Sequence, residues 1–553
     1  MKKIIKFLFI LLTVFSMTAC TKDWLDINDN PNAPTTPELS RLLSGSERFM
    51  TYAFGQGNFV GNNLSSYTHH LVSREVQNYG MTGVANNLYN SWNYFYIYSL
   101  PDFDAIIANA EPEGNLIYSG IAKTLKAYTF SMMVDLWGDI PYSEYNVPAL
   151  TAPKPDKSAD IYNRMIKLLE DGLADLQNTN VVNALKPGSD DFFYAGDKNK
   201  WIRLNNTIRL KLLLQTRNAK SDIPDWQNKL NTLISGNNFI ASGEDFQFWY
   251  TAKVSPDERH PAFTNEYANR STTYYISPYF YEMMKGLTYN NTKNPFAGIS
   301  DPRVPYYFYN QLRTGQDAQN RYSYREENFL SIFFADNSSN SSGDQSSSMT
   351  KIGIYPCGGK FDDGNGGAVS ANTGNGVAPL KLLTFHSLKF MLAELALAHE
   401  ISGNAKDFLK QGMEASITHV NSVAAKQNVA GITNADRDAF TTAVLDKYDA
   451  ASDAGKMEII MSQKWIGNFF SPIDPYTDYR RTGYPALFNP ANTSDPGYGV
   501  NPTVTSTSPA RVAISILTPF PRSLPYPITI ETDLNPNMPP KTDLTLKFIF
   551  WDK

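Results

Sequence analysis

The stretch that decides the fold covers residues 121–142 and reads IAKTLKAYTFSMMVDLWGDIPY. Its apolar residues recur every three to four positions, which places them on one face of a helix: Ile121, Leu125, Tyr128, Met132 and Leu136. Gly138 and Pro141 then end the helix, because glycine suits the residue after a helix and proline cannot continue one. The stretch therefore predicts an amphipathic helix that packs against a neighbour through one face.

The same spacing recurs on both sides of this stretch. Apolar faces predict further helices over residues 158–176, 201–212, 384–399, 405–424 and 455–470. A helix is also expected to open at Thr36-Pro37-Glu38, with Thr36 as the N-cap and Pro37 at the first helical position. Short connections rich in Gly, Pro and Asn favour antiparallel helical hairpins, so the predicted fold class is mainly α.

Two regions break the helical pattern. Residues 237–380 are rich in aromatic residues, Pro, Gly, Ser and Asn, and they predict a large, irregular, loop-rich insertion. Residues 471–553 are rich in Pro and predict an irregular C-terminal segment. The expected organisation is a single domain over residues 38–553, in which residues 38–236 and 381–470 form the helical scaffold.

The N-terminus carries the pattern of a secretion signal. Basic residues within positions 1–6 precede about nine apolar residues, far fewer than the ~20 that span a bilayer. The segment closes on Met17-Thr-Ala-Cys20, which resembles a bacterial lipobox, so residues 1–19 are predicted to be a lipoprotein signal peptide and Cys20 the lipidated first residue. Residues 20–37 predict an extended tether. The alternative is an ordinary secretion signal that happens to contain a cysteine.

Composition argues against several classes of function. The 553 residues carry 49 Lys and Arg against 54 Asp and Glu, and this net charge of −5 argues against nucleic-acid binding, which uses clustered cations. Two cysteines cannot form a disulfide framework or a four-cysteine zinc site, and six histidines leave little for histidine-based catalysis. The sequence also lacks the G-x-S-x-G nucleophile motif. We therefore expect no catalytic residue, metal or cofactor.

Two carboxylate patterns allow other interpretations. Asp135 and Asp139 lie four residues apart, and paired carboxylates can hydrolyse glycosides, but spacing alone does not specify this chemistry and a structural role is favoured. Asp362, Asp363 and Asn365 offer oxygen ligands for Ca²⁺, yet they lack the terminal Glu of a calcium-binding loop, so a plain turn is favoured. Neither pattern predicts an enzyme or a metal site by itself.

Aromatic residues make up 13% of the chain, and they cluster around residues 79–98 and in the insertion. Aromatic faces stack on the C–H surfaces of sugars, while Asn, Asp and Arg side chains bind the hydroxyl groups; peptides can use the same surface. Rings at helical spacing are expected in the core, whereas rings beside turn residues are expected at the surface. The predicted ligand-binding candidates are Tyr79, Tyr89, Trp249, Tyr274, Tyr275 and Tyr307.

Short motifs follow one another in order along nearly the whole chain. After Cys20 they are 24–28 (WLDIN), 30–32 (NPN), 136–142 (LWGDIPY), 201–206 (WIRLNN), 209–212 (RLKL), 393–396 (AELA), 463–465 (QKW), 479–485 (YRRTGYP), 524–527 (LPYP) and 535–537 (NPN). Through them the sequence resembles the SusD/RagB family of outer-membrane nutrient-binding lipoproteins of Bacteroidetes, and within it the branch with the Arg-Arg-Thr-Gly-Tyr-Pro signature.

The resemblance implies a tetratricopeptide-repeat-like scaffold of helical hairpins in a lipid-anchored, surface-exposed protein of the outer membrane. It implies capture of an oligosaccharide and delivery to a TonB-dependent, SusC-like transporter, without enzymatic activity. Capture of peptide or protein by a member of the same family stays open, as does a secreted glycoside hydrolase. The family's ligand residues vary and have no motif, so none is transferred. Arg480 and Arg481 are expected to be structural, binding carbonyls at a helix end.

Overall fold

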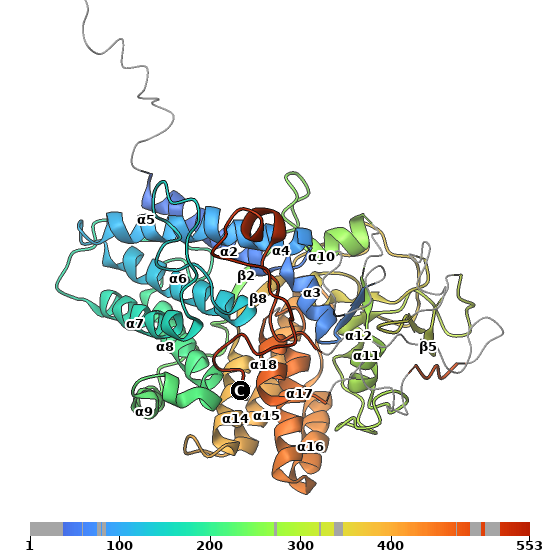
Figure 1. The fold of residues 1–553 in the computed structure, drawn as a ribbon. Helices are drawn as coiled ribbons and strands as arrows, with labels where there is room; N and C mark the ends of the chain where they lie inside the picture. The colour runs from blue at the N-terminus through green and yellow to red at the C-terminus, as the bar shows by residue number, and fades with distance from the viewer. Residues whose placement is uncertain are drawn as a thin grey trace, which may run out of the picture.

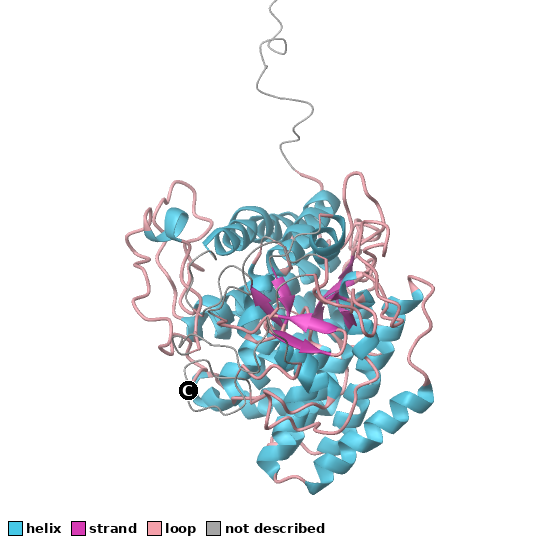
Figure 2. Ribbon diagram, turned by 90° about the vertical axis from the view of Figure 1, so that its right-hand side faces the viewer, coloured by secondary structure: helices cyan, strands magenta, loops and turns pink. Residues whose placement is uncertain are grey.

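The computed structural model describes residues 37–57, 59–73, 79, 85–269, 274–319, 322–336, 347–471, 473–486, 499–503 and 520–553. The predicted signal peptide, Cys20 and nearly all of the tether lie outside this part of the chain. The described residues are mainly helical, with short strands between the helices and loops (Figures 1 and 2). The predicted fold class is therefore confirmed.

The first part of the scaffold is a series of helices that extends from the left of Figure 1 to its centre. They are α2 (Leu39–Phe54), α3 (Val60–Tyr67), α4 (Ala85–Asn93), the π-helical η2 (Tyr94–Ser99), α5 (Leu100–Ala110), α6 (Leu116–Trp137), α7 (Ser158–Gln177), α8 (Lys198–Gln215), η3 (Arg217–Asp222) and α9 (Trp226–Gly236). The stretch at 121–142 supplies most of α6, which packs on α7 as an antiparallel hairpin. The helices predicted over 158–176 and 201–212 correspond to α7 and α8.

Two glycines let α6 and α7 approach closely. A Cβ atom built on Gly120 would lie 2.8 Å from the carbonyl oxygen of Gly172 on α7, closer than real Cβ contacts allow. At the start of the scaffold, the expected cap is wrong. Glu38 is the N-cap residue of α2, so Pro37 precedes the cap instead of opening the helix. From that position the Glu38 carboxylate pairs with Arg41, one turn into the helix, at 3.0 Å.

Short elements with long connections make up residues 237–380. The strands pair antiparallel, β1 (Leu71–Ser73) with β3 (Tyr274–Ile276), β2 (Phe246–Trp249) with β8 (Pro379–Leu383), β4 (Phe308–Tyr309) with β7 (Lys351–Ile352), and β5 (Tyr324–Glu326) with β6 (Phe329–Ser331). The helices here are α10 (Pro261–Phe263), the π-helical η4 (Thr264–Ala268), α11 (Pro278–Lys285), α12 (Val304–Tyr307) and α13 (Ile354–Cys357). β2 and β8 tie this region to the scaffold, because α14 follows β8 almost directly.

The second part of the scaffold lies at the bottom of Figure 1. It contains α14 (Phe385–Leu397), α15 (Ala405–Ala425), α16 (Asn434–Ala450), α17 (Asp453–Gly467) and α18 (Asp474–Thr482), and η6 (Ile528–Thr532) follows later in the chain. The helix predicted from 384 begins after the N-cap Thr384, and those predicted from 405 and 455 are α15 and α17. The patterns did not predict α16, and α18 lies in the segment expected to be irregular.

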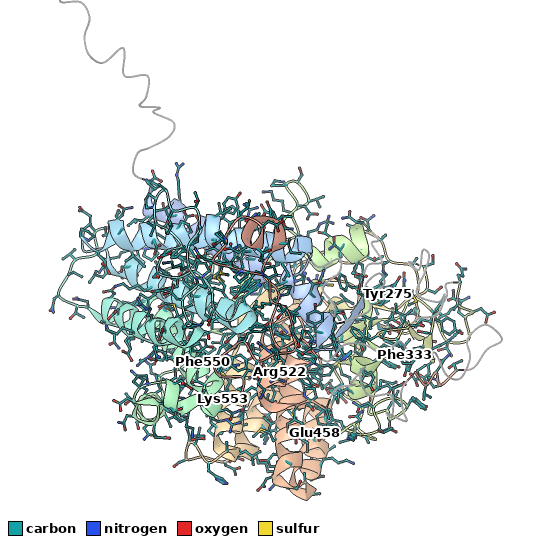
Figure 3. The ribbon with its side chains drawn as sticks, in the orientation of Figure 1. Tyr275, Phe333, Glu458, Arg522, Phe550 and Lys553 are labelled. Atoms are coloured by element: carbon teal, nitrogen blue, oxygen red, sulfur yellow. The ribbon has the colours of Figure 1, made fainter. Side chains whose placement is uncertain are left out.

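The C-terminal segment crosses back over the first scaffold helices. Arg522 and Phe550 lie beside the scaffold in Figure 3, and the Trp551 indole is buried and donates to Asp135 of α6 at 2.8 Å. Arg480 of α18 donates to the carbonyl oxygen of Arg522 at 2.6 Å and to that of Asp135. The expected binding of carbonyls by this arginine is confirmed.

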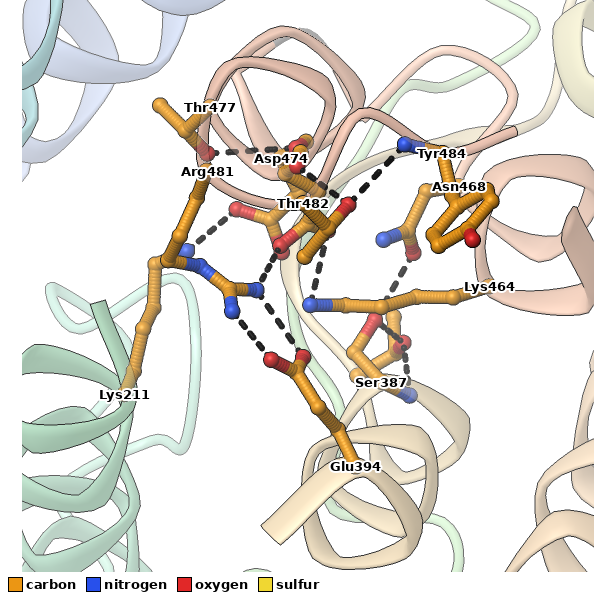
Figure 4. A network of polar contacts seen from close by, with 12 residues as sticks. Lys211, Ser387, Glu394, Lys464, Asn468, Asp474, Thr477, Arg481, Thr482 and Tyr484 are labelled. Carbon is orange, nitrogen blue, oxygen red and sulfur yellow. Dashed lines mark hydrogen bonds and ion pairs between the residues drawn. The ribbon is translucent and has the colours of Figure 1, made fainter. Parts of the chain in front are cut away.

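Arg481 behaves differently, because its partners are carboxylates. It binds Glu394 of α14 and Asp478 of its own helix in a buried network of charges (Figure 4). Lys464 of α17 binds the same Asp478 at 2.8 Å, and Lys211 of α8 binds Asp474. This network joins α18 to three scaffold helices, so the expected carbonyl contacts of Arg481 are replaced by ion pairs.

Candidate functional site

The six predicted ligand-binding residues divide into two groups by exposure. Tyr79, Tyr275 and Tyr307 are buried, and Tyr89, Trp249 and Tyr274 reach solvent, with Tyr89 the most open at 37% exposure. A buried ring presents no face to a ligand. Only the second group can therefore stack on a sugar in this structure.

The buried tyrosines have partners in the segments that cover them. The Tyr79 hydroxyl lies 2.9 Å from Nε2 of His69, and Tyr307 stacks on Phe469 with ring centroids 5.6 Å apart. Tyr275 stands opposite Val72 in the β1–β3 pair. Tyr307 ends the short helix α12, and Tyr275 lies in the strand β3. Other segments cover these rings, so the exposure expected of rings beside turn residues is wrong for all three.

The three exposed rings do not form one site. Tyr274 donates to the side-chain oxygen of Asn63 at 3.2 Å, and the ring of Trp249 lies 5.4 Å from the Lys426 amine. Tyr89 lies on α4 and lines a cavity described below, which neither Trp249 nor Tyr274 lines.

A cavity with polar and aromatic walls lies between α2, η2 and the chain that leads from β2 into η4, and its volume is about 490 Å³. We call it the arginine cleft. Its walls combine tyrosine and phenylalanine rings with planar polar side chains, and its lining residues are Arg48, Tyr52, Gln56, Gly57, Phe59, Asn90, Tyr94, Tyr250, Asp257, Arg259, Pro261, Thr264 and Asn265.

The aromatic wall of the arginine cleft is ordered by ring contacts. The Tyr52 and Tyr250 rings are parallel, with centroids 6.3 Å apart and planes 2° apart. Tyr94 meets Phe59 edge to face at 4.9 Å. The guanidinium of Arg48 lies 5.3 Å from the Tyr52 ring centroid, and its Nε donates to the Tyr52 hydroxyl at 3.3 Å. Arg48 and Tyr52 are spaced i, i+4 on α2, which places them on one face of the helix.

The opposite wall carries a fixed ion pair. Arg259 donates to both oxygens of Asp257, at 2.9 and 2.8 Å, and the Thr264 hydroxyl donates to the same carboxylate at 3.2 Å. Hydrogen bonding from Arg259 lowers the pKa of Asp257, so the carboxylate is charged at neutral pH. These bonds hold two polar groups in place before any ligand arrives.

A second cavity lies on the other side of the helix formed by α4 and η2. We call it the Tyr89 groove; its volume is about 380 Å³, and it is lined by Tyr89, Trp92, Asn93, Tyr96, Ile97, Pro141, Tyr145, Pro153, Ile530, Glu531 and Leu534. Most of these side chains are apolar. Its one carboxylate, Glu531, is occupied: it accepts from the Trp92 indole at 3.2 Å and from Asn535 at 2.8 Å, and burial raises its pKa.

Asp135 of α6 and Asp139, which follows the end of this helix, both have structural contacts. Asp135 is buried and accepts from the Tyr162 hydroxyl at 2.6 Å as well as from Trp551. Asp139 accepts from the backbone N–H of Ser158, the first residue of α7, at 2.8 Å. Burial of Asp135 leaves no room for a glycosidic bond between the two groups, which supports the structural interpretation.

The carboxylate of Asp362 is bound by hydrogen-bond donors of the protein. The carboxylate accepts from the Asn310 amide at 2.7 Å and from the backbone of Gly364 at 3.1 Å, as a plain turn would. Within the described residues there is no group of three or more His, Cys, Asp or Glu side chains placed to hold a metal ion. Cys357 is buried, and burial raises the pKa of its thiol, so it is not a reactive nucleophile.

The comparisons with known proteins place this geometry in a family. Residues 31–502 match the model of a family described as starch-binding and associating with the outer membrane, SusD-like. No curated protein sequence matches the chain. Throughout the described residues, no helix combines the length and apolar character needed to cross a bilayer.

Solved structures of the same shape cover most of the chain. A chitin-binding protein is 20% identical with a TM-score of 0.63, covering 93% of this chain and 100% of its own. A SusD homologue from Bacteroides fragilis is 18% identical with a TM-score of 0.61, covering 94% and 99%. A SusD/RagB family protein from Bacteroides thetaiotaomicron is 21% identical with a TM-score of 0.61, covering 91% and 95%. With its family match over most of its length, the chain belongs to the SusD/RagB family of outer-membrane-associated binding proteins.

Proposed function

We propose that this protein captures oligosaccharide at the cell surface, binds it in the arginine cleft and delivers it to a TonB-dependent transporter of the outer membrane. The observation that carries the proposal is the make-up of the cleft. Rings of Tyr52 and Tyr94 share one cavity with the side chains of Arg48, Asp257 and Asn265. Rings bind the C–H faces of sugars, and planar polar side chains bind adjacent hydroxyl groups.

The size and order of the cleft support the same proposal. Its volume of about 490 Å³ falls within the ~300–1,000 Å³ range of small-ligand sites. Because Arg259 and Asp257 are already bound to one another, they lose little side-chain entropy when a ligand docks. Water-mediated hydrogen bonds and ring stacking contribute only a modest net free energy of binding, so we expect weak to moderate affinity.

The choice of test ligands follows from the relatives. The family description names starch, and two of the similar structures are described as chitin-binding. A titration panel should therefore contain maltooligosaccharides and chitooligosaccharides beside other glycans and a set of peptides. Heat with peptides alone would replace the saccharide proposal with peptide capture by the same family.

Asn265 offers a variant that separates binding from folding. It lines the cleft from η4 and is half-buried, and Asn265→Ala should weaken binding of the best saccharide by about tenfold, the effect of one good hydrogen bond. Asn231→Ala on α9 is the matched control, because Asn231 does not line the cleft. Equal affinities of both variants and the wild type would remove the arginine cleft from the proposal.

Binding without covalent chemistry is part of the proposal. Its support is that Asp135 accepts hydrogen bonds from Tyr162 and Trp551, and Asp139 accepts one from the backbone of Ser158. Incubation with the panel, followed by a reducing-sugar assay, should show no release over a buffer blank. Steady turnover would instead favour a glycoside hydrolase.

The Tyr89 groove supports the proposed transporter contact. Ile97 and Leu534 on its rim are 57% and 67% exposed, and an exposed apolar patch beside an apolar groove is typical of a protein contact. Ile97→Asp should reduce co-purification with the cognate barrel protein. Leu185→Asp is the control, since Leu185 is 54% exposed and lies away from the groove lining. Undiminished capture by the Ile97 variant would argue against this surface.

A further inference from the structure

The arginine cleft has an unbalanced positive charge. Its charged lining residues are Arg48, Arg259 and Asp257, and the last two neutralise one another. We propose that the ligand of the cleft carries an anionic group, a carboxylate or a sulfate on a sugar ring, and that Arg48 binds it. This inference rests on the proposed function, because it names the ligand class of the same site.

Arg48 is held in position but not neutralised. Its Nε donates to the Tyr52 hydroxyl, and its guanidinium lies over the Tyr52 ring. Among the described residues no carboxylate lies within ion-pair distance of this side chain. The two terminal nitrogens are therefore available, and this end of the guanidinium can bind the two oxygens of a carboxylate or sulfate at once.

Glu258, the carboxylate of the protein that could compete with a ligand for Arg48, is bound to other side chains. Glu258 is the carboxylate whose pKa the charge of Arg48 helps to lower, after the larger effects of its own hydrogen bonds. Yet the Glu258 carboxylate accepts from the Lys253 amine at 2.7 Å and from the Thr251 hydroxyl at 3.0 Å, and these are the first causes of its lowered pKa. It is therefore bound to its own neighbours, and Arg48 keeps a net charge for a ligand.

Gln56 gives an independent sign of a missing partner in the cleft. This residue lines the cavity and is buried, and neither atom of its amide has a hydrogen-bond partner in the described part of the chain. Leaving a buried amide unpaired reduces stability, so such groups are rare in proteins. Because Gln56 lines the cavity, an oxygen-rich ligand in the cleft can supply the partner.

Long-range electrostatics cannot replace this contact. The net charge of the whole chain is −5, which repels an anion at a distance. Affinity for an anionic sugar must therefore come from short-range contact with Arg48. Removing one guanidinium should then have a selective effect on charged ligands.

The test compares neutral, carboxylated and sulfated oligosaccharides of matched length by isothermal titration on the full mature chain. The ligand that binds most tightly should be a carboxylated or sulfated oligosaccharide. Which of these two binds more tightly identifies the anionic group that the cleft recognises. Arg48→Gln should weaken that ligand by about tenfold, the gain of a charge-assisted over a neutral hydrogen bond, and change neutral ligands by less than about threefold. Arg41→Gln is the control, because Arg41 is exposed on the same helix and pairs with Glu38 outside the cleft.

Ionic strength adds a second readout. Binding of the anionic ligand to the wild type should weaken when the salt concentration is raised from about 20 to about 300 mM, a range over which the Debye length shortens severalfold. Binding to Arg48→Gln should not weaken over the same range. A neutral saccharide that binds most tightly and depends on Asn265 would overturn the anionic ligand and leave the proposed function standing. Failure of every saccharide to bind would overturn both. Equal losses for charged and neutral ligands in Arg48→Gln would also overturn the assignment.

Discussion

Replacing Arg481 with methionine should destabilise the fold through the buried charge network. The Arg481 side chain is 0% exposed; its Nη2 donates to Glu394 at 2.9 Å and to Asp478 at 2.8 Å, and its Nη1 also binds Glu394. Methionine keeps much of the volume and removes the charge. The change therefore tests the ion pairs of α18 more than its packing.

The size of the effect follows from what remains. Breaking a buried ion pair by removing one partner typically costs about 3–5 kcal/mol, because the other charge stays desolvated. Here Glu394 would keep Arg217 at 3.3 Å, and Asp478 would keep Lys464 at 2.8 Å. These partners relieve part of the penalty, so we expect a loss near the lower end, about 3 kcal/mol.

Urea denaturation followed by circular dichroism measures this loss. Lys456→Met is the matched control, because its exposed pair with Asp453 should contribute less than about 1 kcal/mol. The double variant Arg481→Met/Glu394→Met should recover part of the stability, since it removes both desolvated charges of one pair. If Arg481→Met lost no more than Lys456→Met, the buried network would not stabilise the attachment of α18.

Three further predictions concern stability at low pH, the packing of α6 on α7, and the attachment of the protein to the membrane. Burial lowers the pKa of His260 and His419 to about 3, so these groups add stability above their unfolded pKa that is lost as pH falls, about 2 kcal/mol each between pH 6.5 and 5. Burial also lowers the pKa of His70 and His386, which adds to this loss. Burial raises the pKa of Asp135 and Asp245 to about 6, which opposes the loss by about 1 kcal/mol each, and the partly exposed Asp102 opposes it by less. The four histidines outweigh these carboxyls, so urea denaturation should show lower stability at pH 5 than at pH 7, and an unchanged midpoint would contradict the ionisation states. Gly120→Ala should lower the melting temperature through a clash with the α7 backbone that costs about 1–3 kcal/mol, and an unchanged value would refute the close helix contact. Cys20→Ser should move the protein from the membrane fraction to the soluble fraction, and unchanged fractionation would count against the lipid anchor.

The helices that the sequence predicted are those with a continuous apolar face. α7 and α15 each bury one such face, and their spacing reflects that contact. α6 and α14 are buried on nearly all sides, so the apolar spacing correctly predicted a helix there, but the packing of α6 through a single face is wrong. α16 has few buried residues, among them Phe440 and Val444, so its face is too narrow to show a period. α18 was missed for another reason, because buried charges hold it, and its sequence DPYTDYRRT reads as polar loop.

The candidate site was less predictable, because the exposure of a ring depends on which distant segments of the chain pack over it. A tyrosine beside a glycine indicates a loop, but it does not indicate whether another segment covers that loop. Tyr275 shows the limit, since it lies in a strand paired with β1. The arginine cleft brings together Arg48 and Tyr52 from α2 with Asp257 and Arg259, about two hundred positions later. Only the i, i+4 spacing of Arg48 and Tyr52 was visible in the sequence.

One helix separates the polar cleft from the apolar groove. Asn90 and Tyr94 of the α4–η2 helix line the arginine cleft, whereas the Tyr89 groove is lined from the same helix by Tyr89, Trp92, Asn93, Tyr96 and Ile97. The two sets have no residue in common, so they lie on different faces of the helix. A hydrated sugar needs hydrogen-bonding groups, and a protein contact needs apolar surface that can be dried. Because the two surfaces share the helix but no side chain, substitutions at Arg48 or Asn265 should leave barrel capture intact, and a substitution at Ile97 should leave saccharide binding intact.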